Sequence, residues 1–243
     1  MKVLFVGPTL PDAARCAPGL DIRPPAIQGD LYRAVRDGAA VIGLVDGGFE
    51  YTAPVWHKEI LYALSEGVAV LGAASMGALR AAECRAFGMV GIGTIAQAYA
   101  DGTLVDDADV AQLHAPAELG WASLTEPLVN IVATLQQPHL PAGFTPDLCD
   151  RIEAAARQLH FKERTWAAIA DRVDLPDTGL RTRLERDLKA SACNRKREDA
   201  LLLVAAMTAH AGERSPDRPA WVFQETTLWR DLLDRENAKL LMF

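Results

Sequence analysis

Short apolar runs alternate with helix-like stretches through the first hundred residues of the chain. Residues 3–6, 40–45 and 68–71 are aliphatic runs of the length and composition of buried β-strands. A helix is expected over residues 30–37, and another is expected to begin at Pro54, where proline suits a first helical turn. Strands that alternate with helices predict an α/β fold with a doubly wound, mostly parallel sheet of the Rossmann or flavodoxin type.

Residues 67–83 form the most informative stretch of this pattern. The apolar run at 68–71 is followed by the small residues of 72–74, and then by strong helix formers from residue 76 onward. This order predicts a strand, a tight turn that carries Ser75, and a helix. Ligands of open α/β sheets bind at such corners, because helix N–H groups point into the crevice beyond the strand ends.

The second half of the chain has a helical pattern. Residues 87–93 fit either a fourth strand or a glycine-rich turn, and residues 110–114 fit a strand. The proline-rich stretch 138–146 predicts a boundary, with an α/β core domain over 1–140 and an all-helical C-terminal region over 146–243. The expected helices of that region are 147–158, 162–172, 180–192, 194–211 and 226–238.

Composition narrows the classes of function. The chain has 243 residues and a formal net charge of −7, so it lacks the basic footprint of a nucleic-acid-binding protein. Its four cysteines are far apart, as is typical of reduced thiols in a cytoplasmic protein. The apolar start at residues 3–6 is too short for a signal peptide, and no run approaches a membrane span. We therefore expect a cytoplasmic protein without a membrane partner.

Ser75 is the candidate nucleophile, because a strained turn would expose its hydroxyl beside a helix N-terminus. His57, at the neighbouring strand-to-helix loop, is the natural general base. Either Asp46, at the end of the preceding strand, or Glu59 could orient that imidazole. Each residue also has a simpler reading: serine is a favoured helix N-cap, and a lone histidine in a first helical turn is usually a surface residue.

Cations near this corner could bind an anionic group. Lys58 and Arg80 could hold a carboxylate or phosphate, although Arg80 and Glu83 also have the spacing of an ordinary helical ion pair. Cys84 could reach the same crevice as another nucleophile, but it fits better as a small buried residue.

A second cluster of polar residues lies beyond residue 105 in the sequence. Asp107 and Asp109, with His114 further on, could bind Mg²⁺ or position a base, although aspartates at such places more often form turns. No His/Cys set has zinc-ligand spacing, and no phosphate-binding glycine motif is present in the sequence. We therefore expect neither a metal nor a nucleotide cofactor on this chain.

A set of runs in fixed order resembles the TfuA-like proteins, the partners of YcaO enzymes in peptide backbone thioamidation. The resemblance covers roughly residues 1–135, and its most specific runs are His57-Lys58-Glu59 and Ser75-Met76-Gly77-Ala78-Leu79-Arg80. The other matching runs are 24–26, 29–30, 42–47, 55–56, 72–74, 81–83, 87–93, 106–111 with His114, and 126–130. An acidic residue often follows the aspartate pair in that family, whereas this chain has Ala108.

The resemblance implies a role in sulfur delivery. TfuA-like proteins are understood to hydrolyse the C-terminal thiocarboxylate of a ThiS-like, ubiquitin-fold sulfur carrier and to release sulfide for the YcaO enzyme. The expected partners are thus a YcaO enzyme, the carrier and the precursor peptide. ATP is expected on the YcaO partner only, in keeping with the missing nucleotide motif.

Thioacid hydrolysis is acyl transfer, which needs a nucleophile or activated water, a base and an oxyanion site. Ser75 would attack or hold water, His57 would be the base, and Asp46 would orient it. The N–H groups of Met76 and Gly77 would form the oxyanion site. These two residues and the rest of the predicted site would bind substrate: Met76, Gly77, Lys58, Arg80, Glu59 and Glu83.

Two other functions compete with this one. The chain could be a non-catalytic adaptor that binds and activates YcaO or recruits carrier and peptide, with Trp166 and Trp229 of the helical region as docking anchors. It could also be a generic hydrolase of small acyl substrates. Activity without any carrier protein would favour the last of these.

Overall fold

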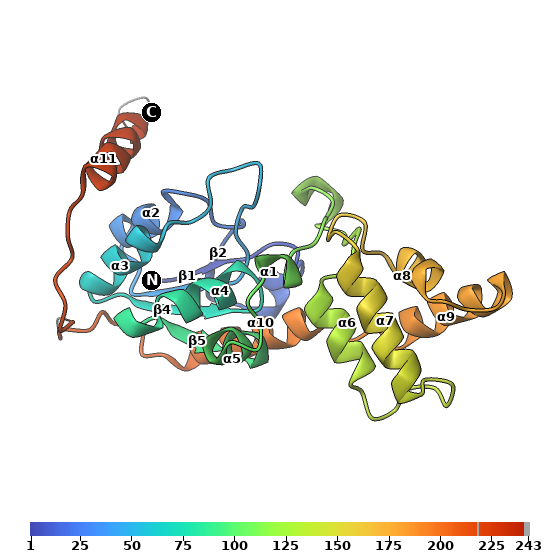
Figure 1. Ribbon diagram of the computed structural model, residues 1–243. Helices are drawn as coiled ribbons and strands as arrows, with labels where there is room; N and C mark the ends of the chain where they lie inside the picture. Colours follow the sequence, from blue (N-terminus) through green and yellow to red (C-terminus); the bar gives the residue numbers. More distant parts are fainter. Residues whose placement is uncertain (218, 241–243) are drawn as a thin grey trace. The chain divides into compact units, whose positions relative to one another are not determined.

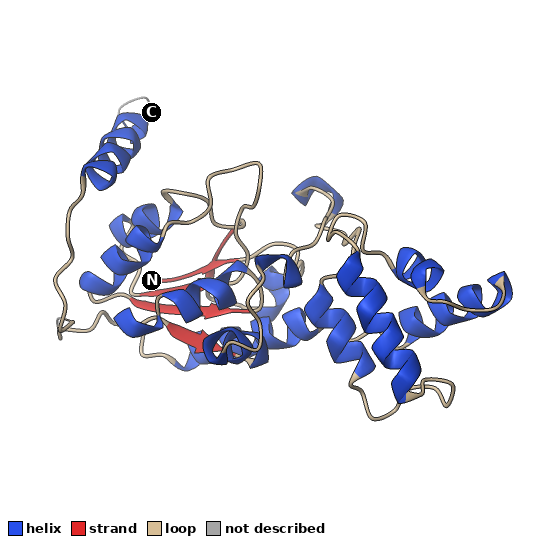
Figure 2. Cartoon of the chain, viewed as in Figure 1, coloured by secondary structure: helices blue, strands red, loops and turns tan. Residues whose placement is uncertain are grey.

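The computed structural model describes residues 1–217 and 219–240, and it contains a parallel β-sheet (Figure 2). In the described part of the chain the sheet has five strands, ordered β2-β1-β3-β4-β5, and every neighbouring pair is parallel. This is the doubly wound α/β architecture that the sequence predicts. The strands are β1 (Lys2–Phe5), β2 (Asp21–Arg23), β3 (Val41–Leu44), β4 (Ala69–Ala73) and β5 (Val90–Ile92).

The helices agree closely with the predicted C-terminal pattern. Helix α7 (Pro146–Gln158) and helix α9 (Thr178–Ala190) each begin behind a side-chain cap, from Thr145 and Asp177. The other helices are α1 (Ala13–Cys16), α2 (Asp30–Arg36), α3 (His57–Ser65), α4 (Met76–Glu83), α5 (Thr94–Asp101), α6 (Leu128–Leu135), α8 (Trp166–Arg172), α10 (Arg195–Ala209) and α11 (Thr227–Leu240), with 3-10 turns η1 (Arg85–Phe87), η2 (Asp107–Asp109) and η3 (Ala117–Leu119).

Two details of the strand prediction were wrong or incomplete. Residues 110–113 form no strand, and His114 makes only an isolated bridge to Ser123. Strand β2 lies between the first predicted strand and the first predicted helix, where no strand was expected. Its Asp-Ile-Arg sequence has no apolar run that would have indicated one. Of the two readings left open for residues 87–93, the strand is present, as β5.

Helices cover both faces of the sheet. Helices α2, α3 and α4 pack on one face, where Leu31, Ile60 and Ala81 join the core around Phe5. Helices α1 and α10 pack on the other face. Figure 1 shows α10 on the opposite side of the strands from α2 and α3. Gly43 lets α10 approach closely, since a Cβ atom there would lie 2.2 Å from the sulfur of Met207. The sequence pattern did not predict that α10, which comes late in the chain, covers one face of the sheet.

The chain groups into two compact units. One comprises Met1–Thr103 together with the chain from Asp199 onward, and the other comprises Leu104–Glu198. The second unit has its own core of helices α6 to α9, with Ile131, Ile152 and Ile169 fully buried. The predicted domain limits, 140 and 146, lie inside this second unit and stay a prediction.

The C-terminal segment packs on the first unit. Arg214 donates to the carbonyl oxygens of Ala39 and Val35, at 2.8 and 2.6 Å. Trp229 of α11 is buried against Tyr32 and Tyr62. Among the described residues, no helix is both long enough and apolar enough to cross a membrane.

Candidate functional site

The corner between β4 and α4 is strained. Ala74 has a φ of 65°, a left-handed conformation that is costly for a residue with a side chain. The N–H of Ser75 donates to the carbonyl of Ala73 at 2.8 Å, which closes a three-residue γ-turn around Ala74. Strained backbone of this kind gathers at functional sites, where the surrounding packing holds it.

Ser75 follows that turn at the carboxyl end of β4. Its side chain is half-buried and makes no capping hydrogen bond to helix α4. The structure shows no hydrogen-bond partner for its hydroxyl among the described residues. The N-cap reading of this serine is therefore not supported, and the hydroxyl is available to a ligand.

The first N–H groups of α4 differ in availability. The N–H of Gly77 donates to the carbonyl of Val45 at 3.0 Å, so it is not free to serve as an oxyanion donor, contrary to our expectation. Gly77 also lies very close to β3, where an added Cβ atom would be 1.8 Å from the carbonyl oxygen of Leu44. The N–H of Met76 has no hydrogen-bond partner within the described ranges and is the remaining donor beside Ser75.

Asp46 follows β3 and is almost completely buried. One carboxylate oxygen accepts from the N–H groups of Gly7 and Thr9, at 2.9 and 3.0 Å, and the other accepts from the Thr9 hydroxyl at 2.5 Å. These bonds join the carboxyl ends of β1 and β3, the point of a 2-1-3-4-5 sheet where ligands usually bind. Asp46 therefore binds the β1–α1 loop rather than orienting His57.

His57 belongs to a different cluster. Its Nε2 atom lies 2.8 Å from Oε2 of Glu83, and Nη1 of Arg80 lies 2.6 Å from the same oxygen. Arg80 is held in place, since its Nε donates to the carbonyl of Val55 at 3.3 Å. Glu83 is thus the carboxylate partner of His57, a role the sequence did not assign to it.

The structure does not bring Ser75 and His57 into hydrogen-bonding contact. His57 pairs with Glu83 at the last turn of α4, whereas Ser75 precedes its first residue. Glu83 is eight positions after Ser75, about 12 Å along the helix axis. The serine–histidine dyad therefore stays a prediction that this conformation does not support, because its placement depended on the path of the loop between β3 and α3.

Glu59 and Lys58 contact other parts of the first unit. The Glu59 carboxylate accepts from the N–H groups of Gly29 and Trp56, at 2.9 and 3.1 Å, and so joins the starts of α2 and α3. Burial raises the pKa of Glu59 to about 7. The ammonium group of Lys58 lies 4.6 Å from the ring centre of Phe223. Glu59 has a structural role at this junction and does not orient His57.

The polar group after residue 105 lies in the second compact unit. Asp106 accepts from the N–H of Ala108, as expected for a turn-forming aspartate. Asp109 is buried, which raises the pKa of its carboxyl group. Asp107 begins the same 3-10 turn, and Nδ1 of His114 lies 2.9 Å from the carbonyl of Ala115. Among the residues that the structure describes, no three His, Cys, Asp or Glu side chains form a metal-binding group.

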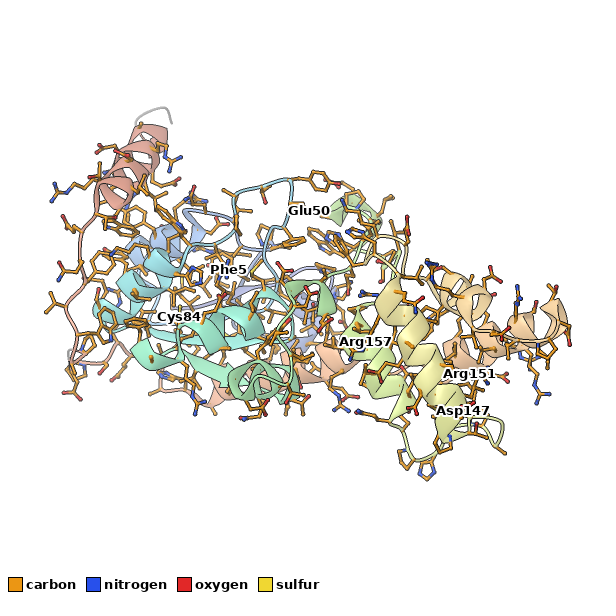
Figure 3. All side chains as sticks on the ribbon, viewed as in Figure 1. Phe5, Glu50, Cys84, Asp147, Arg151 and Arg157 are labelled. Atoms are coloured by element: carbon orange, nitrogen blue, oxygen red, sulfur yellow. The ribbon has the colours of Figure 1, made fainter. Side chains whose placement is uncertain are left out.

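Cys84 is not a suitable nucleophile. It directly follows α4, and its side chain, labelled in Figure 3, is buried in the core. Burial, and secondarily the charge of Glu83, raises the pKa of its thiol to about 11, so the reactive thiolate is scarce at neutral pH. Trp166 and Trp229 are also buried, at 6% and 1% exposure, so neither is free as a docking anchor.

Thr9 and Gly7 are site residues that the sequence analysis did not single out. Their only signal was their position, in a Gly-Pro-Thr loop beyond the carboxyl end of the first strand. A serine or threonine in such a loop is too common to identify as functional without the carboxylate that it meets.

The comparison with protein families finds one matching model, described as TfuA-like protein, over residues 46–165. The matched stretch includes Asp46, His57 and Ser75. A comparison with curated proteins finds no match. The family is associated with YcaO-dependent thioamidation, and the match supports a role linked to that modification, with a YcaO enzyme as a partner in general. Through residues 46–165, the chain belongs to the TfuA-like protein family.

Proposed function

We propose that this protein hydrolyses the C-terminal thiocarboxylate of a ThiS-like sulfur carrier and releases sulfide for a YcaO enzyme. The observation that carries the proposal is the half-buried hydroxyl of Ser75 at a strained strand-to-helix corner; this hydroxyl has no hydrogen-bond partner among the residues that the structure describes. The adjacent N–H of Met76 supplies an oxyanion donor. The family match supports the sulfur-delivery context of this chemistry.

In the first step, the Ser75 oxygen attacks the thiocarboxylate carbon. A carbon–oxygen bond forms, the carbon–sulfur bond breaks, and the serine proton leaves on sulfur as hydrosulfide. Water then cleaves the ester, which gives the carrier carboxylate and a proton and restores the hydroxyl. Both steps balance without ATP, a metal or a redox partner on this chain, and ATP is used by the YcaO enzyme.

The His57 cluster has another role in this proposal. His57, Arg80 and Glu83 lie at the far end of α4 from Ser75 and form hydrogen bonds and ion pairs with one another. We assign them to binding the carrier protein rather than to proton transfer. His57→Ala is thus expected to raise KM for the carrier about tenfold, with a smaller change in kcat.

The test is sulfide release from a thiocarboxylated carrier in the absence of YcaO. Ser75→Ala should lower kcat at least ~100-fold, because the acyl-enzyme route is lost. Ser65→Ala is the matched control, since Ser65 lies in α3 and its hydroxyl donates to the carbonyl of Tyr62. Trapping the carrier as an ester on Ser75, followed by mass spectrometry, gives direct evidence for the intermediate.

Unchanged sulfide release by Ser75→Ala would exclude Ser75 as the nucleophile. If wild-type protein released no sulfide yet stimulated YcaO, the adaptor function would replace the hydrolase. Hydrolysis of small thioacids at a rate that the carrier protein does not exceed would instead indicate a generic hydrolase.

A further inference from the structure

The three residues that follow β3 contact both the β1–α1 loop and the start of helix α4. Asp46 accepts three hydrogen bonds from the Gly7–Thr9 loop through its buried carboxylate. On either side of it, Val45 and Gly47 contact the start of helix α4. Segment 45–47 is therefore the structural link between the β1–α1 loop and the corner that carries Ser75.

The contacts with α4 are close. The carbonyl of Val45 accepts from the N–H of Gly77 at 3.0 Å. Gly47 lies directly beneath Met76, because a Cβ atom added to Gly47 would be 2.7 Å from the Met76 Cγ atom. A shift of segment 45–47 must therefore move Met76 and Gly77, the residues immediately after Ser75.

The contacts with the β1–α1 loop fix segment 45–47 in turn. The hydroxyl of Thr9 is 2% exposed and donates to Asp46 at 2.5 Å. Hydrogen bonds to an ionised acceptor are among the stronger ones in proteins, and removing one partner leaves a buried group without its bond. Loss of the Asp46 carboxylate would release two backbone N–H groups and this hydroxyl together.

We propose that Asp46 and Thr9 are positioning residues for the Ser75 corner, and that they act through segment 45–47 rather than through His57. This inference rests on the proposed function for its kinetic part only. The hydrogen bonds of Asp46 fix the position of segment 45–47 relative to the β1–α1 loop. That segment in turn fixes the position of the Met76 N–H relative to the Ser75 hydroxyl. A misplacement of about 1 Å in such a pair is enough to cost on the order of 100-fold in rate.

The kinetic test compares four variants in the sulfide-release assay. Asp46→Ala and Thr9→Val should lower kcat about 10- to 100-fold with KM within about twofold of wild type. Asp46→Asn should retain most of kcat, since its carbonyl oxygen can accept the two N–H groups and its amide can donate to the Thr9 oxygen. Thr9→Ser keeps the hydroxyl, so its kcat should stay close to that of wild type.

A second measurement needs no activity. Amide hydrogen exchange of the full-length protein should be faster in Asp46→Ala than in wild type at two places: at Gly7 and Thr9, which lose their acceptor, and at Gly77, whose N–H is bonded to Val45. Circular dichroism and thermal unfolding verify that the variant is folded. This measurement remains valid even if wild-type protein releases no sulfide, so failure of the proposed function and failure of this inference are distinguishable.

Three results would overturn the inference. Faster exchange at Gly7 and Thr9 alone would show that segment 45–47 does not transmit the change. Equal losses of kcat in Asp46→Asn and Asp46→Ala would show that the charge itself acts in the reaction. Wild-type kcat in a folded Asp46→Ala protein would exclude any positioning role.

Discussion

The two edges of the parallel sheet are built in contrasting ways. At the amino edge, the C-terminal segment binds backbone groups just before the strands begin. Arg214 donates to two carbonyls, and the N–H of Ser215 donates to the carbonyl of Gly67 at 2.8 Å. In the opposite direction, the ammonium group of Lys2 in β1 donates to the carbonyls of Thr208 and His210 in that segment, at 3.0 and 2.7 Å. These bonds satisfy polar groups and stabilise the fold.

At the carboxyl edge, the backbone is strained and one hydroxyl is left free. Ala74 has a left-handed conformation, and the Ser75 side chain has no partner in the described part of the chain. The comparison teaches that the amino edge holds contacts that only stabilise the fold, whereas the carboxyl edge holds both stabilising contacts and the site of the proposed chemistry. Changes at the amino edge should affect unfolding alone, whereas changes at the carboxyl edge should affect both unfolding and sulfide release.

The largest effect is expected at Gly77. Gly77→Ala would place a methyl group against the carbonyl of Leu44, so α4 must move away from β3. We expect a loss of about 3 kcal/mol of unfolding free energy, at the upper end for overpacking, together with loss of sulfide release. Chemical denaturation measures the loss of unfolding free energy. Gly143→Ala is the control, because an added Cβ atom there meets nothing within 4 Å; equal midpoints for the two variants would contradict the prediction.

A smaller effect is expected at the amino edge. Arg214→Ala removes the donor to two backbone carbonyls and should lower the unfolding free energy by about 2 kcal/mol. Sulfide release by the folded fraction should match wild type. Arg235→Ala is the matched control, since Arg235 is exposed and donates within its own helix, to the carbonyl of Asp231. A reduced kcat in Arg214→Ala would break the separation between the two edges.

The smallest effect is expected at the strained turn itself. Ala74→Gly should raise the unfolding free energy by up to about 1 kcal/mol, because glycine adopts a left-handed conformation without the steric cost. Sulfide release should fall several-fold, since the corner that holds Ser75 becomes less rigid. Glu50→Gly is the control, as Glu50 has a φ of 59° in a similar turn. A variant that is more stable and equally active would show that the strain serves no purpose.

The sequence predicted the features that depend on local pattern. The strands at 41–44 and 69–73 and the helix at 146–158 follow directly from apolar runs, spacing and caps. The corner at Ser75 was recognisable for the same reason, since small residues between a strand and a helix leave few alternatives.

Features that depend on packing between distant segments were not predictable. The partner of His57 depends on the path of the loop between β3 and α3, and the partner of the Gly77 N–H depends on how α4 sits on β3. Asp46 was correctly placed at the end of a strand. Its partners, Gly7 and Thr9, become its neighbours only through the parallel pairing of β1 with β3.

Helix α10 has a consequence for how this protein is made. Residues 200, 203, 204 and 207 complete one hydrophobic face of the sheet, yet the ribosome synthesises them after the whole of the second unit. Until then, α10 cannot cover the face of the sheet that contains Leu4, Val41 and Leu71. A chain released before residue 207 therefore exposes an aliphatic surface that is prone to aggregation and that chaperones can bind.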